Sequence, residues 1–179
     1  MKGIVFTEFL DLVEKKYGLA MVDDLIENSE LSSGGVYTAV GTYEFSEMLQ
    51  LLTRLSTNVQ ISTDDLLLVY GEHFFQVLVD NYGELLNAYK DPLDLLASIE
   101  NHIHVEVRKI YPDAELPTFE VIERLEGSLT MDYKSSRSMH RFGLGLMNKT
   151  FEYFGRKAEI QTEELNPDGT LVRFHIVKA

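Results

Sequence analysis

Apolar residues recur at helical spacing through roughly the first 110 residues of the chain. Near the N-terminus, Val5, Phe9, Leu12 and Val13 have the spacing of one helical face, and Gly18 is a suitable stop. Similar spacing returns in several later stretches. Helices are therefore predicted over residues 1–18, 20–27, 43–55, 62–81 and 91–111, with a loop rich in Ser and Gly over residues 29–41.

Two of these helices have clear signals at their ends. Ser62-Thr63-Asp64-Asp65 fits an N-cap followed by acidic residues, and Asp91-Pro92 fits an N-cap with proline at the first helical position. The helix that begins at Pro92 also carries His102 and His104. At 3.6 residues per turn these two side chains lie about 200° apart around the helix axis. We therefore expect only one of them to be a buried ligand from this helix.

After Pro117 the pattern changes to short runs of residues that favour β-strands. Thr118–Leu125 and Leu129–Lys134 are joined by Glu126-Gly127-Ser128, which predicts a hairpin. A second hairpin is predicted from residues 157–164 and 170–177, which flank Asn166-Pro167-Asp168-Gly169. Between the two hairpins, residues 137–154 have helical spacing, and Gly155 ends that helix.

The order of these elements predicts an α+β fold in a single domain over residues 1–179. We expect a helical N-terminal subdomain, at about residues 1–60, packed on a C-terminal subdomain at about residues 61–179. The second subdomain would hold a four-stranded antiparallel sheet and a helix. A ligand held between the subdomains would suit one cooperative domain.

Composition narrows the possible functions. The formal charge is −13, from 16 basic against 29 acidic residues, which argues against binding to nucleic acid. No apolar run approaches the roughly 20 residues of a membrane helix, and the N-terminus lacks a signal-peptide pattern, so we expect a cytoplasmic protein without membrane attachment. The chain has no cysteine, which excludes disulfides, thiolate zinc sites, cysteine-ligated iron–sulfur clusters and cysteine-ligated haem.

The polar run Tyr133-Lys134-Ser135-Ser136-Arg137 lies between a predicted strand and a predicted helix. In an extended segment, Tyr133, Ser135 and Arg137 would point the same way. Together they offer two hydroxyl donors and a guanidinium, which suits a carboxylate or phosphate. The alternative is a solvated turn in which Ser135 or Ser136 caps the following helix.

This Tyr-x-Ser-x-Arg pattern resembles the haem-propionate clamp of the haem nitric oxide/oxygen-binding family, whose members are called H-NOX or HNOB domains. The resemblance extends over essentially the whole chain, including the opening Met1-Lys2-Gly3 and the order of helices and strands. It implies one haem b between the two subdomains, with His104 as the proximal ligand of the iron. His104 begins His104-Val105-Glu106-Val107 and lies 29 residues before Tyr133.

The resemblance assigns further residues to the haem pocket. Pro117 matches a proline that presses on the porphyrin, while His102 stays the competing choice for the iron ligand because helix periodicity does not separate it from His104. Six apolar residues match the gas-binding side, although helix core is an equally good interpretation of each one. They are Val5, Phe9, Phe74, Leu78, Phe142 and Leu146.

The expected preference for one gas over another depends on Phe142, one of these six positions. Family members that hold dioxygen stably have a distal tyrosine, and the matching residue here is Phe142, which has no donor. Bound dioxygen carries partial negative charge that a donor stabilises, whereas nitric oxide and carbon monoxide depend less on one. An apolar pocket therefore favours nitric oxide and carbon monoxide and excludes oxygen. Tyr70 or His73 would change this expectation if either pointed into the pocket.

The resemblance implies a stand-alone gas sensor rather than an enzyme. The predicted last strand ends close to residue 179, so the output is expected from a separate partner, a histidine kinase or a diguanylate cyclase or phosphodiesterase of cyclic-di-GMP. Loss of the iron–His104 bond on nitric oxide binding would relax strain from Pro117 and shift the two halves, with Gly71 and Gly145 as pivots or as packing glycines.

Two other classes of function stay open from the residues. The cluster around Arg137 would also suit a haem-free module that binds a small acidic ligand. A peroxidase is a third hypothesis, but the apolar distal set lacks polar groups that would act on peroxide. No catalytic triad, phosphate-binding loop or carboxylate cluster with metal spacing is visible in the sequence.

Overall fold

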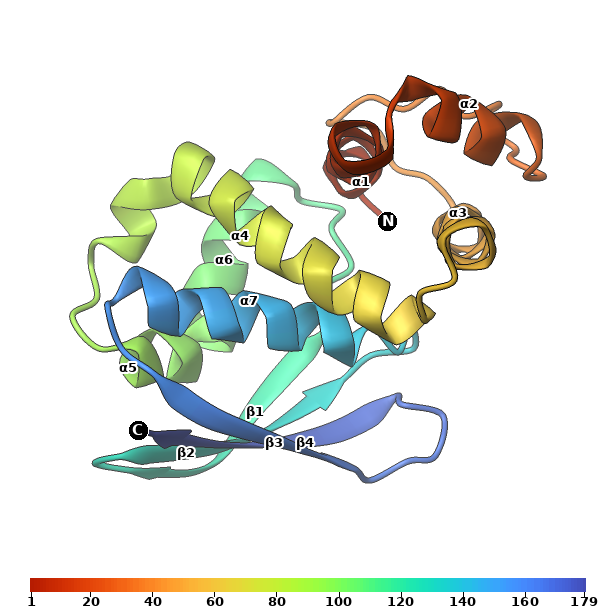
Figure 1. The fold of residues 1–179 in the computed structure, drawn as a ribbon. Helices are drawn as coiled ribbons and strands as arrows, with labels where there is room; N and C mark the ends of the chain where they lie inside the picture. The colour runs from red at the N-terminus through yellow and green to blue at the C-terminus, as the bar shows by residue number, and fades with distance from the viewer. The chain divides into compact units, whose positions relative to one another are not determined.

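The computed structural model describes all residues from Met1 to Ala179 and has an α+β fold (Figure 1). It divides into two compact units, Met1–Tyr70 and Gly71–Ala179, and the boundary falls inside one long helix. The elements in chain order are α1 (Gly3–Tyr17), α2 (Leu19–Glu27), α3 (Phe45–Val59), α4 (Thr63–Leu86), α5 (Pro92–Ala97), the π-helical turn η1 (Ile99–Ile103), α6 (His104–Ile110), β1 (Thr118–Leu125), β2 (Ser128–Lys134), α7 (His140–Tyr153), β3 (Ala158–Glu164) and β4 (Leu171–Lys178).

The first unit consists of α1, α2, α3 and the first turns of α4. Gly18 has φ of +84° where α1 ends, a left-handed conformation that explains why the stop is a glycine. At the start of α4, the Ser62 hydroxyl accepts the Asp65 N–H at 3.1 Å, as its capping motif predicts. The core of the unit is apolar and fully buried, and it includes Phe6, Phe9, Leu25, Met48 and Leu51.

A buried carboxylate orders the loop between α2 and α3. Glu47, only 2% exposed, accepts hydrogen bonds from the hydroxyls of Ser32 (2.5 Å), Ser33 (2.5 Å) and Tyr37 (2.6 Å). The Ser33 N–H donates a fourth bond at 3.1 Å. The Tyr37 ring also stacks on Phe6, with centroids 4.5 Å apart. The loop is therefore anchored by one side chain of α3 rather than by secondary structure of its own.

The second unit is built on an antiparallel sheet with strand order β1-β2-β4-β3. Along β2 and β4 every second residue is buried, as expected for strands with one covered face. α7 lies along that face, and its buried side includes Leu144, Met147 and Phe151 (Figure 1). On the opposite face Arg173 binds Asp132 through two nitrogens, at 2.7 and 2.8 Å.

Gly71 marks a close approach of two helices in the second unit. A Cβ atom at this position would lie 2.1 Å from the backbone oxygen of Phe142 in α7, so any side chain would force the helices apart. This contact gives Gly71 a packing role.

The sequence predicted all four strands to within one residue at each end, and the α+β class is confirmed. Two helix predictions were wrong. The helix expected over residues 91–111 is broken into α5, η1 and α6, and the helix expected from Arg137 begins only at His140. In the second case Ser138 has φ of +50°, which is incompatible with a helical turn.

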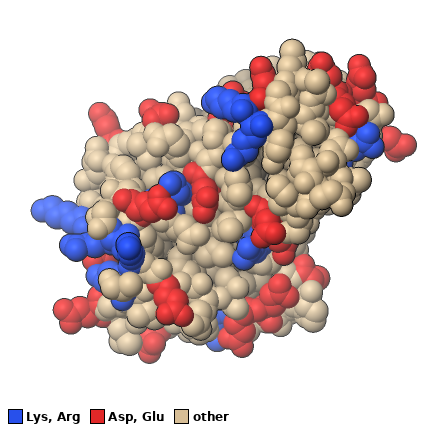
Figure 2. Space-filling model, viewed as in Figure 1, with Lys and Arg blue, Asp and Glu red and all other residues tan.

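None of the helices is both long enough and apolar enough to span a membrane. Charged side chains are spread over the face in Figure 2, where basic groups form small clusters between acidic ones. That face therefore shows no broad basic surface of the kind that binds nucleic acid.

Candidate functional site

His104 is the first residue of α6 and is only 7% exposed. Its Nδ1 lies 3.1 Å from Oε2 of Glu100, one helical turn earlier. Because a carboxylate can only accept, Nδ1 carries the hydrogen of a neutral ring, and Nε2 keeps its lone pair. Metal-ligating histidines have this arrangement, with one nitrogen oriented by a carboxylate and the other available to a metal.

Glu100 also connects this histidine to the sheet. Its Oε2 accepts the backbone N–H of Phe119 in β1 at 3.3 Å, and the Phe119 ring lies 6.0 Å from the imidazole, centroid to centroid. Burial raises the pKa of Glu100, but hydrogen bonds from Phe119 and His104 outweigh it, so the pKa lies below its usual value. Glu100 is therefore an anion at neutral pH.

Burial lowers the pKa of His104 below its usual value, although the hydrogen bond to Glu100 acts in the opposite direction. The side chain is consequently neutral at pH 7, which is the form that binds metals. The contact between His104 and Glu100 is thus a hydrogen bond from a neutral ring to a carboxylate, and it is not a salt bridge.

His102 has different surroundings. Its Nδ1 makes a short hydrogen bond with the phenol oxygen of Tyr89, and that oxygen also accepts the Ser98 hydroxyl at 2.6 Å. His102 is therefore engaged at Nδ1 by a tyrosine from the segment between α4 and α5. The two histidines that periodicity could not separate have distinct partners in the structure.

The polar run from Tyr133 to Arg137 is not extended throughout. β2 ends at Lys134, and Ser135 starts a turn in which its hydroxyl accepts the Arg137 N–H at 3.2 Å. The expectation that three alternate residues of one strand face the same way is therefore wrong for Arg137. The turn nevertheless keeps the three side chains close, since Ser135 hydrogen-bonds the Tyr133 side chain and the charge of Arg137 acts on it.

Tyr133 is 2% exposed, and its phenol oxygen accepts the backbone N–H of Met139 at 2.9 Å. Burial raises the pKa of Tyr133, and the hydrogen bonds from Ser135 and Met139 only partly offset this, so the phenol keeps its proton. A phenol that accepts from Met139 still has its own hydrogen to donate. The Phe119 ring packs edge-on against Tyr133 at 5.5 Å, which places Phe119 between Tyr133 and His104.

Arg137 binds a carboxylate within the chain. One guanidinium nitrogen donates to the Glu115 carbonyl oxygen at 2.7 Å, and the other makes a short ion pair with the Glu115 carboxylate. The Arg137 side chain is 15% exposed and that of Glu115 is 82% exposed. Arg137 thus already performs, with Glu115, the type of contact that an acidic ligand would require.

Four of the predicted apolar pocket residues lie in the second unit. The Phe74 and Phe142 rings are in contact, with centroids 5.5 Å apart, and both Leu78 and Leu146 are half-buried one turn further along their helices. Pro117 is half-buried and directly precedes β1, two residues before Phe119. These residues form apolar surface on α4 and α7, and their role as pocket lining stays a prediction.

The other two predicted pocket residues lie in the first unit. Phe9 is 1% exposed and packs edge-on against Tyr70 at 5.4 Å, while the carbonyl of Val5 accepts the Tyr70 hydroxyl at 2.5 Å. The hydrogen of the Tyr70 hydroxyl is therefore used within the unit. Of the two residues that would have changed the expected gas preference, Tyr70 is directed to a backbone carbonyl; His73 is half-buried on α4.

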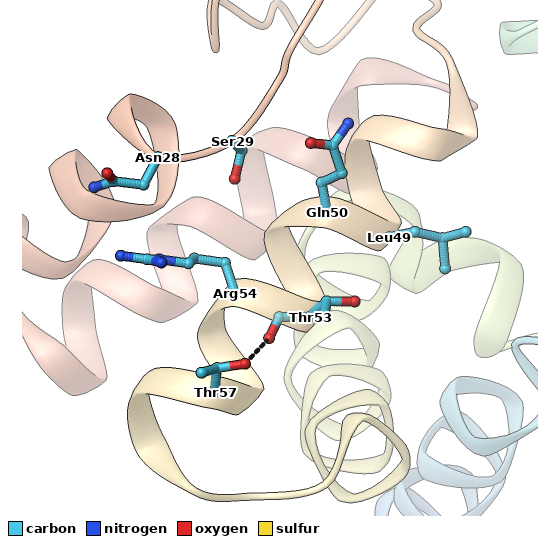
Figure 3. Close-up of a pocket in the computed structure, with 7 residues that line it drawn as sticks. All are labelled: Asn28, Ser29, Leu49, Gln50, Thr53, Arg54 and Thr57. Atoms are coloured by element: carbon cyan, nitrogen blue, oxygen red, sulfur yellow. Dashed lines mark hydrogen bonds between the residues drawn. The ribbon is translucent and has the colours of Figure 1, made fainter.

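A surface cavity of about 350 Å³ lies elsewhere, between the end of α2 and α3 (Figure 3). Polar side chains dominate its lining, and its only cation, Arg54, is held by Asp24 through two bonds of 3.1 Å. Such a lining differs from the apolar slot that a macrocycle requires. The residues that line it are Asn28, Ser29, Leu49, Gln50, Thr53, Arg54 and Thr57.

Comparison with known proteins now decides the family. The sequence profile described as "HNOB: Haem-NO-binding" matches residues 2–162. This chain belongs to the Haem-NO-binding family. Members of this H-NOX family are haem-based gas sensors related to soluble guanylate cyclase. The family membership predicted from Tyr133, Ser135, Arg137 and the spacing to His104 is confirmed.

Solved H-NOX structures have the same fold. The iron(II) unliganded H-NOX protein from K. algicida is 68% identical, has a TM-score of 0.98, and is matched over 100% of this chain and 97% of its own. The H-NOX from Shewanella woodyi, solved bound to IWP-051 in the Fe(II)CO state, is 37% identical with a TM-score of 0.84, over 100% of this chain and 95% of its own.

A curated relative, soluble guanylate cyclase gcy-35 from Caenorhabditis elegans, is 23% identical over 141 residues. That match covers 77% of this chain but only 20% of the cyclase. The H-NOX chain described here therefore corresponds to a small part of that enzyme.

Sequence reasoning missed Glu100, Phe119 and Tyr89. Glu100 could have been found, since a carboxylate four residues before a helical histidine lies beside it. Phe119 and Tyr89 gave no such signal. Phe119 reaches the site through strand pairing, and Tyr89 reaches His102 from outside the helix.

Proposed function

We propose that this H-NOX chain is a nitric oxide sensor that holds one ferrous haem b through His104. The observation that carries the proposal is the state of His104: a buried, neutral imidazole oriented by Glu100 at Nδ1, with the lone pair on Nε2. The donor set fits the group, because a neutral imidazole nitrogen, an arginine that binds a carboxylate and an apolar surface are all present in one compact unit.

When bound, haem would supply a ferrous iron that binds nitric oxide or carbon monoxide. The chain's own residues hold the group at two places. His104 would ligate the iron, and Tyr133, Ser135 and Arg137 would bind the propionates. Arg137 contributes most, since a guanidinium and a carboxylate form charge-assisted bonds.

Gas preference is proposed to follow from the absence of donors among the distal residues. Dioxygen acquires partial negative charge that needs a nearby hydrogen-bond donor, whereas nitric oxide and carbon monoxide depend much less on one. Phe142 and Phe74 present rings in contact with each other, and the Tyr70 hydroxyl is used by Val5. These features support a sensor that excludes oxygen.

We propose that the conformational change that signals gas binding begins at Glu100. Glu100 holds Nδ1 of His104 and also the backbone N–H of Phe119 in β1. Movement of the imidazole would therefore be passed to the first residues of the sheet, next to Pro117. We propose that the resulting change is read by a separate partner, either a histidine kinase or an enzyme that makes or degrades cyclic-di-GMP.

The absorption spectrum of the purified chain tests this function. Expressed with adequate haem supply, the protein should show a Soret band, and its ferrous form should bind nitric oxide and carbon monoxide but form no stable complex with oxygen. A chain without a Soret band would contradict the sensor hypothesis and leave the haem-free module that binds a small acidic ligand through Arg137. A stable oxygen complex would contradict the argument from Phe142.

A further inference from the structure

The turn that precedes His104 has an unusual hydrogen-bond pattern. The Ser98 carbonyl oxygen accepts the His102 N–H at 2.8 Å and the Ile103 N–H at 3.4 Å. The first bond has α-helical spacing and the second has π-helical spacing. The next N–H, that of His104, bonds to the carbonyl oxygen of Ile99 and continues the wider spacing. The backbone thus accommodates one extra residue directly before the proposed iron ligand.

This extra residue sets the direction of the His104 side chain. Removing it would shift the register of α6 by one residue, which turns the helix by about 100° relative to α5. The imidazole would then leave the position in which Glu100 and Phe119 flank it. π-helical turns are uncommon because they pack less well than α-helix, so contacts outside the backbone must hold this one.

Tyr89 provides such contacts at both ends of the turn. Its phenol oxygen accepts the hydroxyl of Ser98, the residue before η1, at 2.6 Å. The phenol also bonds Nδ1 of His102, and the two rings lie 5.7 Å apart. The Ser98 hydroxyl also lies 2.8 Å from the Leu95 carbonyl oxygen, which can only accept, so its one hydrogen is shared between Leu95 and the phenol. One side chain from outside the helix therefore ties Ser98 to His102 across the π-helical turn.

We propose that Tyr89 is a positioning residue for His104: by tying Ser98 to His102 it keeps η1 in its π-helical register and so fixes the orientation of the iron ligand. The inference rests on the proposed function, in which His104 binds the iron. It also assigns a role to His102, which is a structural partner of Tyr89 rather than a competing ligand.

The experiment compares Tyr89→Phe with Tyr153→Phe in the purified full chain. Tyr153 is the matched control, because its hydroxyl donates a single hydrogen bond of 2.8 Å to Asn87 and does not touch η1. Hydrogen exchange is measured at the amides of His102, Ile103 and His104, and the iron–histidine stretching band of the ferrous protein is recorded by resonance Raman spectroscopy. Ser98→Ala removes the same contact from the other side and is measured if Tyr89→Phe does not fold.

Tyr89→Phe should speed exchange at these three amides about tenfold, the effect of losing one hydrogen bond, and should shift or broaden the iron–histidine band. Tyr153→Phe should change neither. Wild-type exchange and an unchanged band in Tyr89→Phe would overturn the inference, and the proposed function would stand if His104→Gly loses haem. If His104→Gly retains haem, both the proposed function and this inference are wrong.

Discussion

Two carboxylates, one in each unit of the molecule, organise their surroundings in opposite ways. Glu47 receives four hydrogen bonds from Ser32, Ser33 and Tyr37, all of them in the loop between α2 and α3. Glu100 receives hydrogen bonds from Phe119 and from His104, whose second ring nitrogen stays available. The first cluster is complete within the chain. In the second cluster Nε2 of His104 keeps a lone pair that a metal could accept, so this cluster indicates a ligand site.

The largest effect is expected on haem binding, and only at the cluster that contains His104. His104→Gly should lose haem, and free imidazole should restore it, because the glycine leaves space where the ring was. His102→Gly is the matched control and should retain haem, since its partner is Tyr89. The Soret absorbance per chain measures both. Haem retention by His104→Gly together with loss in His102→Gly would reverse the assignment.

The next effect concerns stability. Glu47→Gln should lower the free energy of unfolding by about 2 kcal/mol, because hydrogen bonds to a charged acceptor are replaced by bonds to a neutral amide that also brings donors. The Soret absorbance should not change. Denaturant unfolding followed by circular dichroism gives the difference, and an unchanged midpoint would mean that the loop between α2 and α3 is held by the packing of Tyr37 alone.

The difference in stability between the wild type and Glu47→Gln should depend on pH. Burial raises the pKa of Glu47, but the hydrogen bonds from Ser32, Ser33 and Tyr37 outweigh it and leave the pKa below its usual value. A carboxyl with a lowered pKa stabilises the folded state above the usual value, about 4.3, and loses this contribution as pH falls through the folded-state pKa. The wild type and Glu47→Gln should therefore converge in stability as the pH falls from the usual value through the lower folded-state pKa. A difference that persists in acid would contradict the ionised state of Glu47.

The smallest effect is expected at Glu100. Glu100→Gln keeps a hydrogen-bond acceptor for His104 but removes the charge, so haem affinity should fall about tenfold without loss of the Soret band. Haem transfer to an acceptor protein measures the change. Equal affinity in the wild type and the variant would show that Glu100 orients the ring without tuning it.

The strands and the family could be predicted from the sequence, whereas the contacts that arrange the candidate site could not. The hairpin signals at Glu126-Gly127 and Asn166-Pro167-Asp168-Gly169 are local, so β1 to β4 could be placed closely. The break at η1 has no local signal, since it depends on Tyr89, which lies outside the helix. The late start of α7 depends on the turn that Ser135 and Ser138 make after β2.

The candidate site shows the same division. The residue types at positions 104, 133, 135 and 137 were sufficient to suggest the family, because their spacing is distinctive. The reason given for their proximity was incomplete, however. Arg137 joins Tyr133 through a turn and not along a strand, and Phe119 connects Tyr133 to His104 by packing that only the folded chain shows.

The strand order has a consequence for synthesis on the ribosome. β2, which carries Tyr133, pairs with β1 at once but receives its second neighbour only when β4, residues Leu171–Lys178, has emerged. Lys178 of β4 also binds Asp91, the cap of the helix that leads toward His104, at 2.6 Å. A nascent chain therefore exposes an open edge of β2, beside Tyr133, until β4 has emerged and paired with it.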